Sequence, residues 1–153
     1  MERPPKILIV EDDYLQTAFT VPALQNAFRG SEIKQVETEL EFRELLEDIA
    51  TDPPDVIVMD VMLPWTWPEP ERIPAPEDVQ AGGYHMAGLR CAALLSRYET
   101  TKAIPVILYT VLEAADLSQE LRDLNNVYVL TKESDFEPLI DRIREVTGRP
   151  SSW

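Results

Sequence analysis

The sequence is poor in cysteine and histidine, with one of each among its 153 residues. A single cysteine, Cys91, excludes a disulfide framework and a cysteine-based zinc site. Its neighbours are alanine and leucine in a helical pattern, so we interpret it as a buried structural thiol. His85 lies at the junction of a loop and a helix, which is more typical of a polar surface group than of a catalytic base.

Long apolar runs are also absent, and basic residues are scarce. No segment approaches the about 20 apolar residues of a membrane helix, and the first residues lead straight into a predicted strand. The formal net charge of −14 predicts a surface that repels nucleic acid and anionic lipid. We therefore expect a cytoplasmic protein without a signal peptide, which binds neither nucleic acid nor a membrane.

Short runs rich in valine and isoleucine alternate with helical patterns, and this alternation indicates βαβ units with a parallel sheet. The length suits a single domain over residues 1–153. We predict an α/β fold of the doubly wound, flavodoxin-like (βα)5 kind, a three-layer sandwich with strand order 2-1-3-4-5. The predicted strands are Lys6–Val10, Ile33–Glu37, Asp55–Asp60, Pro105–Thr110 and Val127–Thr131.

Helical patterns and capping signals fill the intervals between these strands. The first helix is predicted over Asp13–Phe28, and its inward stripe consists of Leu15, Phe19, Leu24 and Phe28. Capping boxes, in which a hydroxyl and a carboxylate each bind an amide at a helix start, are predicted at residues 38–41 and 134–137. Two further helices are expected near residues 86–98 and 114–124.

The stretch from Pro64 to Gly83 follows neither a helical nor a strand period. It holds five prolines with Trp65 and Trp67, and it closes on two glycines. Loops longer than about 12 to 15 residues are uncommon in compact domains and are either functional or disordered. We interpret this stretch as a long insertion after the third strand, ordered and packed beside the strand ends. Residues 149–153 form a short tail.

Polar residues of different kinds stand at the ends of four predicted strands. In chain order they are Glu11 with Asp12, Asp60, Thr110 and Lys132. In an open parallel sheet, ligands bind outside the carboxyl ends of the strands. An acidic pair, a further carboxylate, a hydroxyl and an ammonium would therefore meet at one edge. That set suits a divalent cation together with a transferable phosphoryl group.

The carboxylates of this set favour magnesium. Mg²⁺ prefers oxygen ligands and keeps several waters, so one or two carboxylates and a phosphate suffice to bind it. Three carboxylates brought together there, Glu11, Asp12 and Asp60, would raise one another's pKa unless a cation is present. The neighbouring Asp13 has a simpler explanation as the N-cap of the first helix. A carboxylate such as Asp60 can also act as a phosphoryl nucleophile and give an acyl phosphate.

These strand-end motifs resemble those of the receiver domain of two-component response regulators. The matching segments are Ile7–Asp13, Asp55–Pro64, Pro105–Thr110 and Leu130–Lys132, which together with the helices cover nearly the whole chain except residues 64–83. The resemblance implies a stand-alone receiver in which Asp60 is phosphorylated by a histidine kinase or a phosphotransfer protein. A downstream protein would read the phosphorylated state. The sequence does not identify that protein, and it leaves open whether phosphorylation drives formation of a homodimer.

The resemblance also implies roles for the other strand-end residues. Glu11 and Asp12 would bind Mg²⁺ beside Asp60, with the backbone carbonyl of Met62 as a further ligand. The side chains of Thr110 and Lys132 would hold the phosphoryl oxygens and couple them to a conformational switch. Such a protein is a signalling module rather than an enzyme with its own substrate.

Three positions depart from the family pattern. Val111 follows the threonine where the family has a small residue, Val129 stands in place of the switch aromatic, and Glu133 replaces the proline after the lysine. These departures support an alternative, a receiver-like binding module that acts without phosphate. An Asp-nucleophile phosphohydrolase would need a second Asp at Met62. A flavin carrier would need a Ser-, Thr- or Gly-rich loop after the first strand, where this chain has acids.

Overall fold

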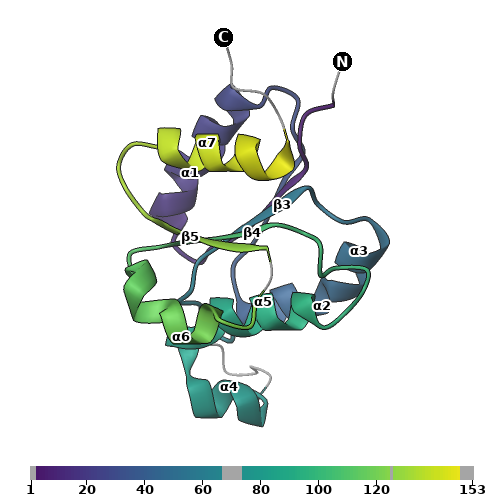
Figure 1. The fold of residues 1–153 in the computed structure, drawn as a ribbon, viewed down its shortest axis with the longest axis vertical. Coiled ribbons are helices and arrows are strands. Elements are labelled where there is room, and N and C mark those ends of the chain that lie inside the picture. The colour runs from purple at the N-terminus through teal and green to yellow at the C-terminus, as the bar shows by residue number, and fades with distance from the viewer. Residues whose placement is uncertain (1–2, 67–73, 125, 149–153) are drawn as a thin grey trace.

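A computed structural model describes residues 3–66, 74–124 and 126–148 (Figure 1). Within these ranges the chain forms one five-stranded parallel sheet with the order β2-β1-β3-β4-β5. The strands are β1 (Ile7–Val10), β2 (Ile33–Val36), β3 (Val56–Met59), β4 (Val106–Thr110) and β5 (Val127–Thr131). The predicted fold class and strand order are therefore confirmed.

Helices cover both faces of the sheet and complete the predicted three-layer sandwich (Figure 1). One face carries α1 (Tyr14–Ala27) and α7 (Glu137–Thr147). The other face carries α2 (Glu39–Glu44), α3 (Leu46–Thr51), α5 (Ala87–Ser96) and α6 (Ser118–Leu121). Short 3-10 turns, η1 (Tyr84–Met86) and η2 (Ala114–Leu117), precede α5 and α6. The helix expected near residues 114–124 is thus a 3-10 turn with one short α-helical segment.

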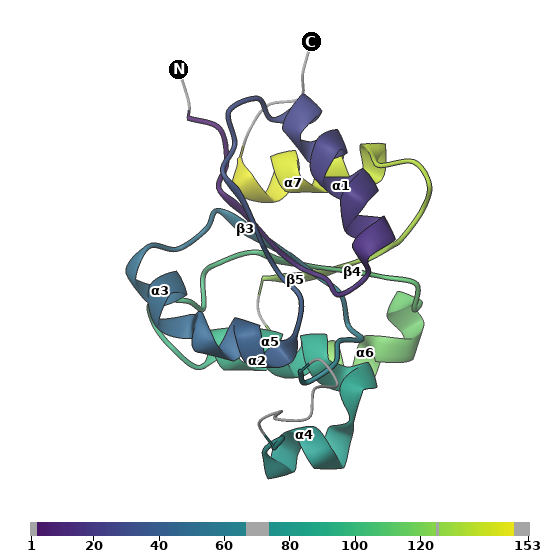
Figure 2. The ribbon, with the colours of Figure 1, turned by 180° about the vertical axis from the view of Figure 1, so that it is seen from behind.

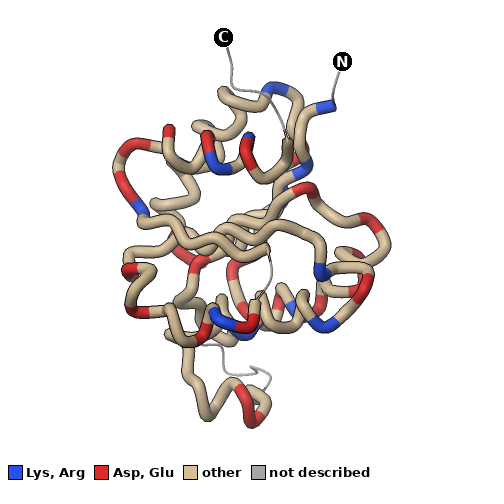
Figure 3. Tube along the Cα trace, viewed as in Figure 1, with Lys and Arg blue, Asp and Glu red and all other residues tan. Residues whose placement is uncertain are grey.

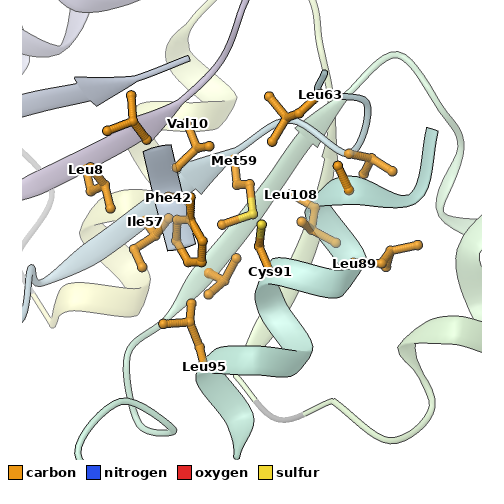
Figure 4. Packing of buried hydrophobic residues seen from close by; sticks show 14 of the residues in the cluster. Leu8, Val10, Phe42, Ile57, Met59, Leu63, Leu89, Cys91, Leu95 and Leu108 are labelled. Atoms are coloured by element: carbon orange, nitrogen blue, oxygen red, sulfur yellow. The ribbon is translucent and has the colours of Figure 1, made fainter. Parts of the chain in front are cut away.

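The apolar core consists of two clusters, one on each face of the sheet. Figure 4 shows the cluster between the sheet and α5, where Phe42 and Cys91 pack against strand residues such as Met59. The second cluster joins the opposite strand faces to Leu24 of α1 and Ile143 of α7. Because both faces of the sheet are covered, the central strands are apolar without alternation. This explains why each of these strands is an unbroken apolar run in the sequence.

The inward face of α1 differs from the predicted stripe. Leu15 and Phe19 are 67% and 66% exposed, so their assignment to the core is wrong. Thr17 and Thr20 are buried on α1 instead, together with Leu24. Each threonine hydroxyl donates to a backbone carbonyl four residues earlier, at 3.0 and 2.7 Å. This bond satisfies the hydroxyl inside the helix, so a polar side chain can occupy the buried face.

The two predicted capping boxes have different outcomes. At the first, half of the box is formed: Thr38 Oγ1 accepts from the amide of Glu41 at 3.1 Å, as expected, whereas the Glu41 carboxylate accepts from the Thr38 hydroxyl at 3.3 Å and not from an amide. The helix is divided into α2 and α3 at Leu45. At the second, the capping box is absent because α7 begins at Glu137, which is therefore the first residue of the helix and not the third. Asp135 accepts from the Glu137 amide at 3.0 Å in its place.

The described part of the 64–83 stretch contains the short helix α4 (Glu77–Gly82), which the sequence pattern did not indicate. Residues 67–73, including Trp67, lie outside the described residues, as does the 149–153 tail. Helix α4 projects from the layer of α2 and α5, on the side opposite α1 and α7 (Figure 2). The expectation that this stretch packs beside the strand ends therefore does not hold for α4.

A buried ion cluster ties this layer together. Glu39, at the start of α2, is fully buried and accepts from Arg90 at 2.7 and 3.0 Å and from Arg43 at 2.9 Å. Arg43 also binds Asp78 of α4 at 2.9 Å, and its guanidinium lies 5.4 Å from the ring centre of Trp65. The cluster thus joins α2, α4 and α5.

Candidate functional site

Backbone hydrogen bonds place the strand-end residues at one edge of the sheet. The amide of Asp60 donates to the carbonyl of Val10 at 2.9 Å, and the amide of Glu11 donates to Val36 at 3.0 Å. The amide of Lys132 donates to the carbonyl of Thr110 at 2.8 Å. These bonds continue the ladders of the sheet by one residue beyond each strand. This register therefore places four residues at the carboxyl edge of the sheet: Glu11, Asp60, Thr110 and Lys132.

Lys132 forms ion pairs with two of the carboxylates. Its Nζ lies 2.6 Å from Glu11 Oε1 and 2.8 Å from Asp60 Oδ2. All three side chains are largely buried, with 12%, 6% and 8% of the Lys132, Glu11 and Asp60 side chains exposed. Paired charges in such a site interact strongly because little water screens them.

Burial and like charge dominate the protonation of Glu11. Its pKa is raised to about 7, because burial disfavours the carboxylate and the charge of Asp60 repels it, against the attraction of Lys132. For Lys132 itself, burial lowers the pKa, but hydrogen bonds and charge from Asp60 and Glu11 outweigh burial and raise it. The ammonium form of Lys132 is therefore secured.

A third carboxylate completes an acidic cluster. Glu11, Asp12 and Asp60 each offer an oxygen, and these oxygens lie within 4.8 Å of one another. Asp12 is half-buried, and burial raises its pKa. The adjacent Asp13 is not part of the cluster, since its Oδ1 accepts from the amides at the start of α1 at 2.9 and 3.2 Å. The prediction that Asp13 is an N-cap is confirmed.

This cluster could hold a divalent cation. With all three carboxyls ionised, the single ammonium of Lys132 leaves two negative charges without compensation. Carboxylate oxygens are the ligands that Mg²⁺ prefers, and a cation at this point reverses the repulsion that raises the pKa of Glu11. Glu11, Asp12 and Asp60 are the residues that could hold such an ion.

Thr110 and Met62 lie at the same edge in different settings. Thr110 is fully buried, and its Oγ1 accepts from the amide of Leu112 at 3.2 Å. In the described ranges, Thr110 makes no side-chain hydrogen bond to Asp60 or Lys132. The amide of Met62 donates to Asp60 Oδ1 at 3.2 Å and so orients the carboxylate.

The positions that depart from the receiver pattern are all accessible or partly so. Val111 is 62% exposed, so its side chain faces solvent rather than the buried Thr110 hydroxyl. Glu133 is exposed, and the bond that joins it to Lys132 is trans, as are all peptide bonds in the described ranges. Val129 packs against the core cluster on the α5 side. Tyr128 points to the other face, where Arg142 lies 5.5 Å from its ring centre.

Two residues beside the site escaped the sequence reasoning. Tyr109 lines a small cavity that Glu11 and Asp60 also line, although in the sequence it is one more residue of the apolar run of β4. Gly88, in α5, packs against the backbone of Asp60. The only sequence signal for Gly88 was a glycine within a helical pattern, which often marks a close approach of another backbone.

The single cysteine and histidine lie outside the acidic cluster. Cys91 is fully buried in α5, and burial raises the pKa of its thiol, which keeps it unreactive. His85 is exposed, with its ring 5.8 Å from that of Tyr84 in an edge contact. Both predicted placements are confirmed. No helix in the described ranges is long and apolar enough to cross a membrane.

Structural neighbours across nearly the full chain are receiver domains of response regulators. The receiver domain of a Francisella response regulator is similar over 94% of this chain and 97% of its own, with 21% identity and a TM-score of 0.67. The chemotaxis response regulator CheY4 of Vibrio cholerae is similar over 94% and 98%, with 20% identity and a TM-score of 0.66. No family model matches the sequence. The chain thus has the fold of response regulator receiver domains.

A further neighbour is a metal-bound receiver-type protein. The Mn²⁺-bound form of the response regulator Rcp1 is similar over 94% of this chain and 91% of its own, with 19% identity and a TM-score of 0.61. The acidic cluster of the present chain is of the kind that binds a divalent metal.

Proposed function

We propose that this protein is a phosphorylation-controlled receiver module in which Asp60 accepts a phosphoryl group from a histidine kinase or a phosphotransfer protein. The observation that carries the proposal is the convergence of Asp60, two further carboxylates and the Lys132 ammonium at one sheet edge. The receiver fold adds support, since response regulators are similar over almost the whole chain.

The geometry fits transfer to a carboxylate oxygen of Asp60. This oxygen forms a bond to phosphorus while the bond from phosphorus to the donor breaks, and the electron pair leaves on the donor. Bound Mg²⁺ would neutralise charge on the transferred group, and Glu11 and Asp12 with Asp60 and the Met62 carbonyl are its proposed ligands. Lys132 Nζ already lies 2.8 Å from Asp60 Oδ2, so it can donate a hydrogen bond to an oxygen of the phosphoryl group on Asp60.

Thr110 is the proposed hydroxyl donor to the phosphoryl group. It ends β4, next to the backbone amide of Lys132. Its hydroxyl accepts from Leu112 in the present structure, which leaves its own proton available. A hydroxyl placed in this way could report the modification to the loop that follows β4.

The output would be contact with another protein. The net charge of −14 opposes binding to nucleic acid, and acidic residues outnumber basic ones along the trace in Figure 3. We propose a stand-alone cytoplasmic receiver that signals to a downstream protein, with a homodimer of the phosphorylated form as one possible output. The 64–83 stretch with α4 is proposed as an insertion particular to this chain.

The test is phosphorylation by acetyl phosphate with Mg²⁺, followed by intact-mass measurement. One adduct is expected, stable in acid and labile in base. Asp60→Asn should abolish it, whereas the matched control Asp13→Asn, which keeps an N-capping oxygen, should retain it. An adduct that persists in Asp60→Asn would refute the assignment. Absence of any adduct in the parent protein would favour the alternative, a receiver-like binding module that acts without phosphate.

A further inference from the structure

Tyr109 carries a buried hydroxyl that has no hydrogen-bond partner in the described part of the chain. The residue is 4% exposed and belongs to the core cluster on the α1–α7 face of the sheet. A phenolic O–H that leaves water without finding an acceptor is unfavourable, and buried tyrosine hydroxyls are usually paired. The question is which acceptor serves this group.

A cavity beside Tyr109 connects it to the acidic cluster. The cavity has a volume of about 10 Å³, and its lining includes Tyr109, Glu11 and Asp60. Space of this size accommodates about one water molecule, provided that several polar groups surround it. The polar residues Gln16, Thr17 and Thr20 of α1 also line this cavity.

The two threonine hydroxyls of α1 at this cavity each donate one hydrogen bond and accept one. Thr17 and Thr20 donate to backbone carbonyls at 3.0 and 2.7 Å. Thr17 accepts from Gln35 at 3.1 Å, and Thr20 accepts from Gln16 at 3.2 Å. The carboxylates of Glu11 and Asp60 are charged, so they are stronger acceptors than these hydroxyl oxygens for a proton that comes from the Tyr109 side.

Each carboxylate oxygen of Glu11 and Asp60 has one protein donor. For Glu11 the donors are Lys132 at 2.6 Å and the Asp13 amide at 3.1 Å. For Asp60 they are Lys132 at 2.8 Å and the Met62 amide at 3.2 Å. Since a carboxylate oxygen has two lone pairs, each can accept one bond more.

We propose that one water molecule occupies this cavity, accepts a hydrogen bond from Tyr109, and donates to the carboxylates of Glu11 and Asp60. Tyr109 is then a positioning residue of the acidic site. The water satisfies the phenolic proton and uses the spare lone pairs of the carboxylates. Its consequence for phosphoryl transfer rests on the function proposed for Asp60, whereas its consequence for cation binding does not.

The Tyr109 phenol also lies near the backbone of the loop that follows Lys132. Burial raises the pKa of Tyr109, and the backbone N–H of Glu133, the residue after Lys132, acts in the opposite direction. This N–H lies near the phenol oxygen but does not form a hydrogen bond of regular geometry with it. A proline at position 133 would lack this N–H. Tyr109 thus lies between the carboxylates and the chain segment from which their ion-pair partner extends.

The test compares Tyr109→Phe with the control Tyr98→Phe. The control removes the same hydroxyl from a tyrosine that is 54% exposed. Mg²⁺ affinity is measured from thermal melts over a Mg²⁺ titration. Loss of a residue that orients metal ligands weakens binding by about 10-fold or more, and we expect this of Tyr109→Phe alone. Unchanged affinity together with higher stability would overturn the proposal, because it would mean that the hydroxyl is merely unpaired.

Two measurements on the parent protein keep the proposal testable if Tyr109→Phe does not fold. A high-resolution crystal structure should show a water within hydrogen-bond distance of Tyr109 and of a carboxylate. An empty cavity would refute the proposal. With ring-labelled tyrosine, the NMR signal of Tyr109 should shift on addition of Mg²⁺ while that of Tyr98 stays in place, and a Tyr109 signal that ignores Mg²⁺ would count against it. Neither measurement involves phosphate, so each stands or falls apart from the function of Asp60.

Discussion

Gly88 of α5 lies against the backbone of Asp60 so closely that a Cβ on Gly88 would be 2.3 Å from the Asp60 carbonyl oxygen. The next atom in its path is the Cα of Val61 at 2.7 Å. Both are backbone atoms, so no side-chain rotation relieves the clash. The amide of Gly88 also donates to the Val61 carbonyl at 2.8 Å, which fixes the helix at this distance.

We expect Gly88→Ala to displace Asp60 and to lower the free energy of unfolding by about 1 to 3 kcal/mol, as overpacking in a tight site does. Mg²⁺ affinity should fall as well, because Asp60 is one of the clustered carboxylates. The control is Gly148→Ala, where the φ of +70° imposes strain but no atom lies within 4 Å of the added Cβ. It should cost about 1 to 2 kcal/mol and leave Mg²⁺ affinity unchanged. Equal effects of the two variants on Mg²⁺ binding would contradict this account.

Lys132 should be essential to the stability of the cation-free protein. Lys132→Met leaves Glu11 and Asp60 buried side by side with no counter-charge, and breaking a buried ion pair in this way costs about 3 to 5 kcal/mol. Urea denaturation without Mg²⁺ measures this loss. Mg²⁺ should stabilise Lys132→Met more than the parent, since it would then be the only cation near the cluster. A smaller Mg²⁺ effect in the variant would show that Lys132 and Mg²⁺ do not share these carboxylates.

The parts of this fold that could be predicted are those with local causes. The five strands are continuous apolar runs, and Asp13 caps α1 through bonds to amides two and three residues away. Strand order then follows from the usual topology of such units, which brings the strand-end residues to one edge. The strand runs and the usual topology were therefore sufficient to predict that Glu11, Asp60 and Lys132 lie close together.

The features that escaped prediction depend on packing between distant segments. Phe19 looked inward because it is apolar, yet α1 buries Thr20, whose hydroxyl is satisfied within the helix. The sequence has no signal that Glu39 is buried, and its contacts with Arg43 and Arg90 explain its burial. Tyr109 is an ordinary strand residue until the cavity beside it is seen. None of these relationships has a signature within a short window of sequence.

The pH dependence of stability should carry the signature of Glu11. Its folded-state pKa of about 7 lies above its ordinary value of 4.5, so the folded protein keeps this proton where the unfolded chain has lost it. The contribution to stability is fully present below about pH 4.5 and is lost as the pH rises through about 7. Its full size is up to about 3 kcal/mol.

Glu11→Gln imitates the protonated side chain, so it should remove the part of the fall in unfolding free energy with rising pH that is due to Glu11. The measurement is the free energy of unfolding by urea without Mg²⁺ at several pH values from about 4.5 to 8. Saturating Mg²⁺ should flatten the same profile for the parent, because it favours the ionised carboxylate. A decline of equal size in the parent and in Glu11→Gln would assign the effect to other groups.

Breaking the ion cluster at Glu39 should destabilise the α2–α4–α5 layer without affecting cation binding. Within the described ranges, Glu39→Gln removes the ion-pair partner of Arg90 and one of the two ion-pair partners of Arg43, at a side chain that is fully buried. We expect a loss of about 3 to 5 kcal/mol in urea denaturation. The exposed pair of Glu99 and Lys102 provides the control, and Glu99→Gln should cost less than about 1 kcal/mol.

The same cluster also lies close to the chain that leaves Asp60. The amides of Glu39 and Leu40 donate to the carbonyls of Pro64 and Trp65, both at 2.9 Å, so α2 holds the segment that follows the acidic site. Because the carboxylates themselves are fixed by the sheet, Mg²⁺ affinity in Glu39→Gln should match the parent while the protein is folded. Weaker Mg²⁺ binding in Glu39→Gln, measured well below its melting temperature, would instead show that the cluster positions Asp60 through residues 61–65.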